Sequence, residues 1–402
     1  MQSFPPVLCW TGLFAMIIMV SCSNATDPGG RGSGRADQGA DLNDRDFDTV
    51  TIHVGPGAGS VETADFNRDS FPDLAVAIPE DSAVAILLNN GRGYFTAAPG
   101  SPFFANRFPN DIGIADFNKD GNLDLGIANT EVSELTVMLG NGHGQFKQCP
   151  KSPFGVHSRP HTHGIAIGDF NGDGFLDLAT DDWGENKVVV IFGEATMNFG
   201  GETSYLVGNR PYQRLRAADL NADGKSDIVT TNLEGNNATV LLGQGDGKFR
   251  EAEGSPFDCG SAPFGVAIGD VNGDGYADLA IVNSPTITSE SKGRDGLWIL
   301  LGDGTGKFRT MKGSPFATGK SPSRLAIGDL NGDKINDIAV TNYNDRSISI
   351  FYMGKTGVEK IKTMRVGSRP DGICIGDFNR DGKNDIAVSN FDDGTVILFY
   401  SK

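Results

Sequence analysis

Most of the chain alternates short apolar runs with turns rich in glycine, aspartate and asparagine. One unit shows the pattern: residues 164–168 (Gly-Ile-Ala-Ile-Gly) form a first run, residues 177–180 a second and residues 187–192 a third, and a fourth closes the unit. Heptads and long apolar stripes with the helical period do not appear in the sequence. The pattern therefore predicts an all-β protein made of many short strands joined by tight turns.

The turn between the first and second runs has the pattern D-x-N-x-D-x-x-x-D, and this pattern recurs along the chain. Its seven copies begin at Asp65, Asp116, Asp169, Asp219, Asp270, Asp329 and Asp377. A period of about 50 residues is typical of a stack or ring of one supersecondary unit. Seven units of four antiparallel strands predict a seven-bladed β-propeller, because closing the ring limits exposed sheet edges.

The two ends of the chain predict how the ring closes. Strands are expected at about residues 49–54 and 60–64, before the first acidic turn, whereas the last unit offers only three strands and ends at residues 395–400. Residues 49–54 are therefore expected to complete the last blade. Glycine hairpins at 139–146, 242–249 and 301–308 are expected to join third and fourth strands, and Ser-Pro-Phe segments such as 101–103 are expected to lead to the next blade.

The acidic turns also predict a metal site, because carboxylate and amide oxygens at positions 1, 3, 5 and 9 are ligands that Ca²⁺ prefers. Solvated turn residues are the alternative. The seven turns hold 21 aspartates, and the rest of the chain has 30 acidic residues against 34 Lys and Arg, so the net charge of −17 is local to the turns. The predicted ligands are Asp65, Asn67, Asp69, Asp73, Asp116, Asn118, Asp120, Asp124, Asp169, Asn171, Asp173, Asp177, Asp219, Asn221, Asp223, Asp227, Asp270, Asn272, Asp274, Asp278, Asp329, Asn331, Asp333, Asp337, Asp377, Asn379, Asp381 and Asp385.

The motif D-x-N-x-D-G-x-x-D-[LI], followed by Ala-Val or Ala-Ile, resembles the FG-GAP (VCBS-type) repeat that is shared with the propeller of integrin α-subunits. The resemblance covers residues 47–402 and implies calcium at positions 1, 3, 5 and 9 with a backbone carbonyl at position 7. Two copies have Ser70 and Lys334 where the others have glycine at position 6. Up to seven Ca²⁺ ions are expected, with five sites favoured over those that begin at Asp65 and Asp329.

The N-terminus predicts export. Residues 7–20 form an apolar run that is short for a membrane span and suited to a signal peptide. The sequence Val20-Ser21-Cys22-Ser23 resembles a bacterial lipobox, which implies lipidation of Cys22 and an outer-membrane or cell-surface lipoprotein; a cleaved signal peptide with secretion, or a signal anchor, is the alternative. The expected organisation is a leader (1–22), a polar disordered tether (23–46) and the propeller (47–402), with membrane contact only through Cys22.

The antiparallel strand order places the acidic turns and glycine hairpins at one end of the ring and the connections between blades at the other. The residues expected near the channel mouth at that other end are Arg159, His161, His163, Trp183, Arg210, Tyr212, Arg324, Tyr343, Arg369 and Phe391. Aromatic rings among arginines suit a carbohydrate with anionic substituents or a protein partner. The alternatives are that Arg before Pro only braces each blade crossing, and that His157, His161 and His163 hold a transition metal.

The predicted function is an exported, calcium-binding module for adhesion to, or binding of, a carbohydrate or protein ligand. A carbohydrate-active enzyme of the polysaccharide lyase type, with its site at the channel mouth, is the alternative. The sequence has neither G-x-S-x-G nor H-E-x-x-H, and no catalytic residue is assigned. A monomer without nucleic-acid binding is expected.

Overall fold

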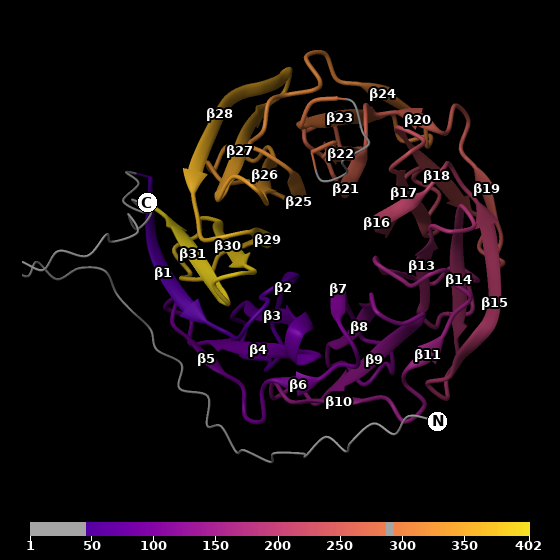
Figure 1. Ribbon diagram of the computed structural model, residues 1–402, viewed down its shortest axis with the longest axis horizontal. Coiled ribbons are helices and arrows are strands. Elements are labelled where there is room, and N and C mark those ends of the chain that lie inside the picture. Colours follow the sequence, from indigo (N-terminus) through magenta and orange to yellow (C-terminus); the bar gives the residue numbers. More distant parts are fainter. Residues whose placement is uncertain (1–45, 287–292) are drawn as a thin grey trace, which may run out of the picture.

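The computed structural model describes residues 46–286 and 293–402, so the predicted leader with Cys22 and nearly all of the predicted tether lie outside the described residues. Within the described residues, seven antiparallel sheets form a closed ring (Figure 1), and the helical content is one 3₁₀ turn, Pro79–Asp81. The all-β, seven-bladed β-propeller is thus confirmed. None of the helical segments described is long and apolar enough to cross a membrane.

Each blade runs from an inner first strand at the channel to an outer fourth strand at the rim. Blade 1 contains β2 (Val61–Ala64), β3 (Asp73–Ile78), β4 (Ala83–Asn89) and β5 (Phe95–Ala97); blade 2 contains β7 (Pro109–Ala115), β8 (Asp124–Asn129), β9 (Glu134–Gly140) and β10 (Phe146–Gln148). Blade 3 contains β12 (Ala166–Gly168), β13 (Asp177–Asp182), β14 (Lys187–Gly193) and β15 (Phe199–Leu206); blade 4 contains β16 (Pro211–Ala218), β17 (Asp227–Asn232), β18 (Asn237–Gly243) and β19 (Phe249–Glu251).

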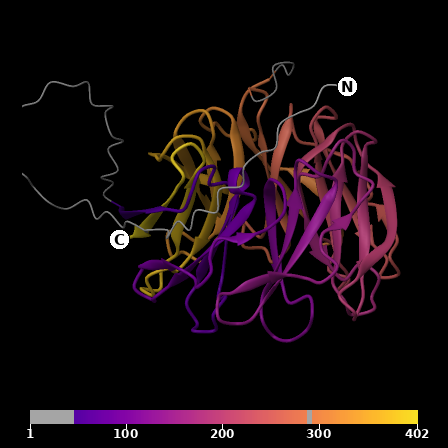
Figure 2. The same cartoon turned by 60° about the horizontal axis from the view of Figure 1, so that its bottom comes forward.

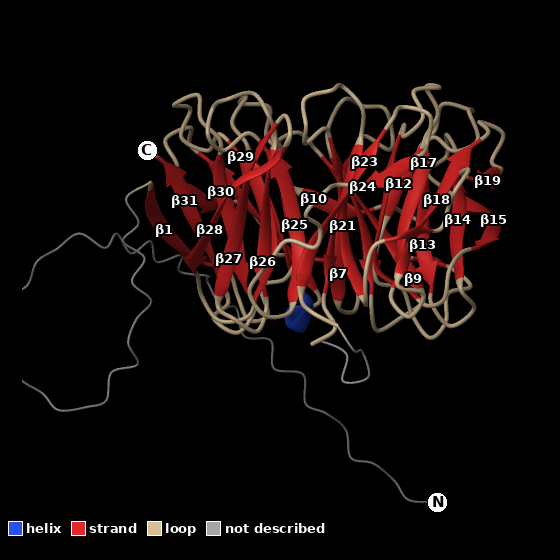
Figure 3. Ribbon diagram, turned by 90° about the horizontal axis from the view of Figure 1, so that it is seen from above, coloured by secondary structure: helices blue, strands red, loops and turns tan. Residues whose placement is uncertain are grey.

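The remaining blades follow the same order. Blade 5 contains β21 (Pro263–Gly269), β22 (Asp278–Asn283), β23 (Gly296–Gly302) and β24 (Phe308–Thr310); blade 6 contains β25 (Pro322–Gly328), β26 (Asp337–Asn342), β27 (Ser347–Gly354) and β28 (Gly357–Arg365). Blade 7 contains β29 (Pro370–Gly376), β30 (Asp385–Asn390), β31 (Thr395–Ser401) and, as its outer strand, β1 (Phe47–His53). The connections gather along two opposite edges of the ring, and the 3₁₀ turn lies at the lower edge in Figure 3.

The N-terminal strand closes the ring, as the sequence predicted. Strand β1 pairs antiparallel with β31 from Phe47 opposite Ser401 to His53 opposite Thr395. Figure 2 shows the indigo N-terminal strand beside the yellow C-terminal strands. The Phe47 ring packs edge to face on Phe399, with 6.2 Å between ring centroids. The two chain ends therefore share one hydrophobic core, and the ring cannot open without exposing it.

The Ser-Pro-Phe segments do more than connect blades. In blades 1, 2 and 4 they add a short fifth strand to the third strand, namely β6 (Phe103–Phe104), β11 (Phe154–Gly155) and β20 (Phe257–Asp258). The serine hydroxyl of each segment also accepts a backbone N–H from the third strand, as Ser101 does from Ile86 at 2.9 Å. Ser152, Ser255 and Ser314 make the equivalent bonds. The segment thus protects the outer edge of the blade.

Aromatic pairs join neighbouring blades at the acidic-turn end. The residue after the first aspartate is buried in every turn, and where it is Phe its ring meets a Phe at the start of the next blade's fourth strand. These edge-to-face pairs are Phe66–Phe146, Phe117–Phe199, Phe170–Phe249 and, across the closure, Phe378–Phe95. Such pairs contribute about 0.5–1.5 kcal/mol each beyond the area they bury.

The sixth position of every acidic turn has a left-handed backbone. Five turns have glycine there, but Ser70 and Lys334 adopt φ angles of 68° and 71°. A side chain in this region costs roughly 1–2 kcal/mol, because Cβ approaches the following carbonyl. These two turns therefore fold in the same geometry as the others at a higher conformational cost.

We expect Lys334→Gly to stabilise the protein by about 0.5–1 kcal/mol, since relief of the left-handed strain exceeds the added entropy of glycine in the unfolded chain. Lys383→Gly is the matched control, because Lys383 follows the left-handed glycine of its own turn and has no positive φ; it should lose about 0.5–1 kcal/mol. Denaturant unfolding measures both. Equal effects of the two substitutions would contradict this explanation.

Candidate functional site

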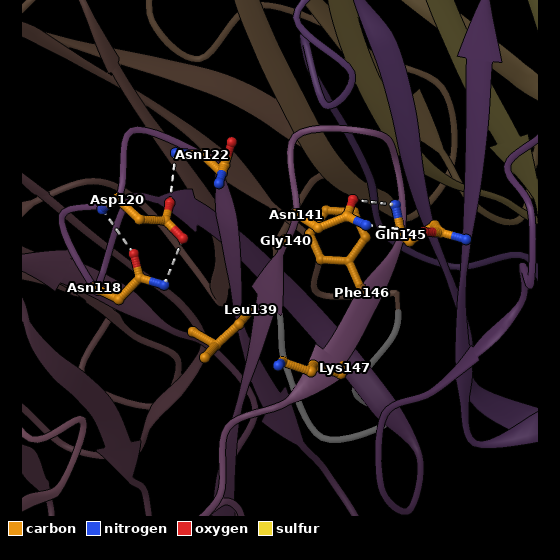
Figure 4. Close-up of a pocket in the computed structure, with 9 residues that line it drawn as sticks. All are labelled: Asn118, Asp120, Asn122, Leu139, Gly140, Asn141, Gln145, Phe146 and Lys147. Atoms are coloured by element: carbon orange, nitrogen blue, oxygen red, sulfur yellow. Dashed lines mark hydrogen bonds between the residues drawn. The ribbon is translucent and has the colours of Figure 1, made fainter.

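Each acidic turn is built from hydrogen bonds between its own side chains and backbone. In the turn of blade 3, Asp169 accepts the N–H of Gly174 at 2.9 Å, and Asn171 accepts the N–H of Asp173 at 2.9 Å through its side-chain oxygen. The amide nitrogen of Asn171 donates to Asp173 at 3.0 Å. The six other turns repeat these bonds. Figure 4 shows the equivalent bonds between Asn118 and Asp120, together with the N–H of Asn122 donating to Asp120.

The ninth aspartate has a different role, which the sequence did not indicate. Its side chain is fully buried, and one oxygen accepts the N–H of the second turn residue while the other accepts an N–H at the end of the third strand. For Asp177 these donors are Phe170 at 2.8 Å and Gly193 at 2.9 Å. Asp73, Asp124, Asp227, Asp278, Asp337 and Asp385 make the equivalent pairs.

Burial raises the pKa of these ninth carboxyl groups, although the two N–H bonds lower it. The pKa rises to about 7 for Asp73 and to about 6 for Asp177. The hydrogen bonds within its own blade therefore stabilise the carboxylate at a position that is shielded from solvent. Both of its oxygens are engaged, but each keeps one lone pair.

The fit of a calcium ion follows from these contacts. The oxygens at positions 1, 3 and 5 lie together at a tight, largely exposed turn and are of the type that a hard cation prefers. The residues described include no group of three or more His, Cys, Asp or Glu side chains arranged to hold a metal ion. Positions 1, 3 and 5 offer oxygens of the type that calcium prefers, at a turn on the surface, whereas the ninth carboxylate is fully buried.

A groove of about 500 Å³ lies beside the acidic turn of blade 2 (Figure 4). Its walls come from the turn residues Asn118 and Asp120 and from the glycine hairpin, including Gln145 and Lys147. The groove is open, and its lining combines polar residues with the apolar Leu139 and Phe146.

At the opposite end of the ring, five of the predicted ligand residues form one cluster, which we call the tryptophan site: His161, His163, Trp183, Arg210 and Tyr212. The guanidinium carbon of Arg210 lies 4.7 Å from the centroid of the Trp183 ring and 5.7 Å from that of Tyr212. The Trp183 and Tyr212 rings meet at right angles with 5.6 Å between centroids. Blades 3 and 4 supply these residues, so the site depends on the ring being assembled.

A buried pair supports the tryptophan site from beneath. His163 is 1% exposed, and its Nδ1 lies 2.8 Å from Asp181, whose other oxygen accepts the N–H groups of His163 and Gly164. The imidazole packs on Tyr212 with 4.3 Å between ring centroids. His161 is half-buried, and burial lowers its pKa. His157 instead pairs with Glu202 on the outer strand of blade 3, so the three histidines do not converge.

Three more of the predicted ligand residues form a second cluster, the tyrosine site: Tyr343, Arg369 and Phe391. The Arg369 guanidinium carbon lies 4.7 Å from the Tyr343 ring centroid and 4.9 Å from that of Phe391. Its nitrogens contact the Tyr343 hydroxyl and, at 2.8 Å, Asp392. Blades 6 and 7 supply this site. In Figure 1 their inner strands lie across the channel from β16, which carries Tyr212.

The last two predicted ligand residues lie apart from both sites. Arg159 is exposed, and its carbonyl oxygen accepts the N–H of Gly184 at 2.9 Å, which braces the blade crossing as the alternative proposed. The carbonyls of Arg210 and Arg369 accept N–H groups in the same way. At these two positions the backbone braces the blade crossing, and the side chain of the same residue contacts aromatic rings. Arg324 is 7% exposed and lies inside the channel.

Arg324 belongs to a charged network that crosses the channel. It contacts Asp111 of blade 2 at 3.2 Å and Asp371 of blade 7 at 3.3 Å. Asp111 is fully buried and also contacts Arg214 at 3.4 Å and Arg216 at 2.9 Å. Burial alone would raise the pKa of Asp111, but the three guanidinium groups hold it well below its usual range. No local sequence pattern indicates these ion pairs, because their members come from blades far apart in the chain.

Next to this network, a cavity of about 370 Å³ opens in the channel between blades 1 and 4. Isoleucines of β7 and of the β12 segment line it, together with Glu62 and Arg216. Burial raises the pKa of Glu62 to about 7, although Arg216 lowers it. Charged groups therefore lie in the channel, and isoleucines line the cavity beside them.

The profile of the family described as FG-GAP-like repeat matches residues 65–127, 116–180, 183–281 and 329–388. These segments cover more than half of the chain and include all seven acidic turns. A search of curated proteins finds no match.

Several solved propellers are similar in fold. The BBS1N chain of a complex with ARL6DN is 10% identical and has a TM-score of 0.58, with 87% of this chain and 94% of that chain covered. An Agrocybe aegerita lectin that recognises non-reducing terminal N-acetylglucosamine is 18% identical with a TM-score of 0.51, covering 84% and 86%. Virginiamycin B lyase from Staphylococcus aureus is 14% identical with a TM-score of 0.55, covering 89% and 100%. At these identities the likeness concerns the fold alone.

We expect Asp111→Asn to destabilise the protein by about 3–5 kcal/mol, because it leaves buried guanidinium groups without their counter-charge. Glu131→Gln is the control, since Glu131 pairs with Arg107 at 3.0 Å on the exposed surface and should cost less than about 1 kcal/mol. Unfolding midpoints in urea compare the two. A small and equal loss in both variants would show that the network does not stabilise the ring.

Proposed function

Because the chain belongs to the FG-GAP-like repeat family, we propose that it is an exported binding module whose acidic turns hold calcium and whose opposite end binds a carbohydrate. The tryptophan site is the observation that carries this proposal, since aromatic rings and a guanidinium from two blades meet there. Export rests on residues 7–20 and on Cys22, which would anchor the protein to a membrane by a lipid. A protein ligand at the same site is the competing outcome.

Binding is favoured over catalysis by the burial of His163. A general base must reach the proton that it removes, and a side chain that is 1% exposed and fixed by Asp181 does not reach a bound polymer. His163 instead supports the ring of Tyr212. The polysaccharide lyase alternative then depends on an Arg or Tyr at the channel mouth, and it is separated from binding by whether an acidic polysaccharide is cleaved or only retained.

The calcium part of the proposal rests on the donor set of the turns. The residues at positions 1, 3 and 5 would hold each ion, with the remaining lone pairs of the ninth aspartate and the carbonyl of position 7. A bound ion would neutralise the carboxylates at positions 1 and 5, and would thereby favour the folded chain. In the turn that begins at Asp329, Lys334 adds a positive charge that opposes an ion.

We expect several calcium ions per chain after dialysis against metal-free buffer. Each site that is saturated a hundredfold above its dissociation constant adds about 2.7 kcal/mol to the free energy of unfolding, so chelation should lower the melting temperature. Asp173→Asn should remove one ion and leave the ninth aspartate of its turn intact. Metal analysis that finds less than one calcium per chain would exclude this part of the proposal.

For the binding face, we expect the double variant Arg210→Ala, Arg369→Ala to lose retention on immobilised polysaccharides at least tenfold, since desolvated Arg and aromatic anchors dominate such interfaces. Arg107→Ala is the matched control, because Arg107 lies at the same end of the ring without an aromatic partner. Product analysis in the same screen reports cleavage. Retention that survives the double variant but is lost on substitution of Asp173 would place recognition at the acidic turns.

A further inference from the structure

Two buried donors of the tryptophan site have no hydrogen-bond acceptor among the residues described. They are Nε of Arg210 and Nε1 of Trp183. They belong to side chains that stack on each other, from neighbouring blades. Buried N–H groups without an acceptor are uncommon in folded proteins and carry a free-energy penalty. Two of them in one cluster indicate a place where an oxygen-rich ligand improves the hydrogen bonding.

The same cluster already contains a seat for a carboxylate. One oxygen of Glu234 contacts Nη1 of Arg210 at 2.5 Å, and the other accepts a hydrogen bond from the side-chain amide of Asn209 at 3.1 Å. The pair is open to solvent, with 33% of the Arg210 side chain and 46% of the Glu234 side chain exposed. An exposed ion pair of this kind is weak, so an incoming carboxylate can replace Glu234.

We propose that the tryptophan site binds a sugar that carries a carboxylate, a hexuronate, and that this carboxylate takes the place of Glu234 on Arg210. The proposal rests on the proposed function and names its ligand class. Arg210 presents a planar fork that suits a carboxylate. Nε of Arg210 and Nε1 of Trp183 are buried in the free protein; displacement of Glu234 would open them to the carboxylate, ring and hydroxyl oxygens of the sugar.

The rings next to the seat favour a sugar over an acidic peptide. Trp183, Tyr212 and His161 are each half-buried, and the centroid of the Trp183 ring lies 5.6 Å from that of Tyr212 and 6.0 Å from that of His161. Flat apolar faces beside polar edges suit the C–H face and hydroxyl rim of a pyranose. Glutamate or aspartate side chains would fill the carboxylate seat and leave these faces without a partner.

The test is calorimetric titration of the full chain with an oligogalacturonate of defined length and with its methyl ester. We expect the acid to bind at least tenfold more tightly than the ester. Glu234→Gln should tighten binding of the acid about two- to fivefold, because it removes the competing carboxylate. Arg210→Lys keeps the charge but loses the fork, and Trp183→Phe keeps a ring but loses the N–H; each should weaken binding about tenfold.

Unchanged affinity for the acid in Glu234→Gln, or equal affinity for acid and ester, would overturn the hexuronate assignment while leaving carbohydrate binding intact. Displacement of the sugar by poly-glutamate at lower concentration than by polygalacturonate would overturn it in favour of a peptide. Failure of the protein to retain any saccharide, acidic or neutral, would instead remove the proposed function itself. Melting temperatures of the variants, expected to be close to that of the parent chain for Glu234→Gln, separate loss of binding from loss of fold.

Discussion

A buried carboxylate that accepts two backbone N–H groups holds each blade together at its acidic-turn end. In blade 3, Asp177 connects the turn that begins the blade's second strand to the end of its third strand through Phe170 and Gly193. This contact fixes Phe170, which in turn packs on Phe249 of the next blade. The acidic turn, the glycine hairpin and the contact between blades are therefore positioned by one side chain. Because the ninth aspartate makes the same two bonds in all seven blades, the ring is a repetition of this interaction.

The two ends of the ring differ because the same side chains recur from blade to blade at only one of them. At the other end, Arg210 and Arg369 stand at equivalent positions, each directly before the proline of a first strand, with φ angles of 58° and 53°. Each carbonyl accepts an N–H from just after the second strand, at Leu233 and Phe391. The backbone thus presents one side chain per blade at a fixed geometry, and the identity of that side chain is free to vary.

The sequence alone was sufficient to predict the features of the fold that depend on repetition. The period of the acidic turns and the missing fourth strand of the last unit predicted the blade number and the closure by β1. Contacts between blades could not be predicted from the sequence. Asp111 and its three arginines come from strands a hundred or more residues apart, and no local pattern marks such a pairing. The ninth aspartate was predicted as a metal ligand from its residue type, but its burial and its two N–H donors depend on how the third strand returns to the turn. Arg324 was expected at the channel mouth, and only the packed ring shows that its charge is used inside the channel.

The division between a constant end and a variable end is tested most directly by X-ray diffraction from crystals grown with calcium and an oligogalacturonate, with anomalous scattering used to locate the ions. The expected result is calcium density at the acidic turns, next to positions 1, 3 and 5, and sugar density at the opposite end, with a carboxylate on Arg210 and Glu234 turned away. Sugar density bridged to the protein by the calcium ions at the acidic turns, with the tryptophan site unchanged, would contradict this account.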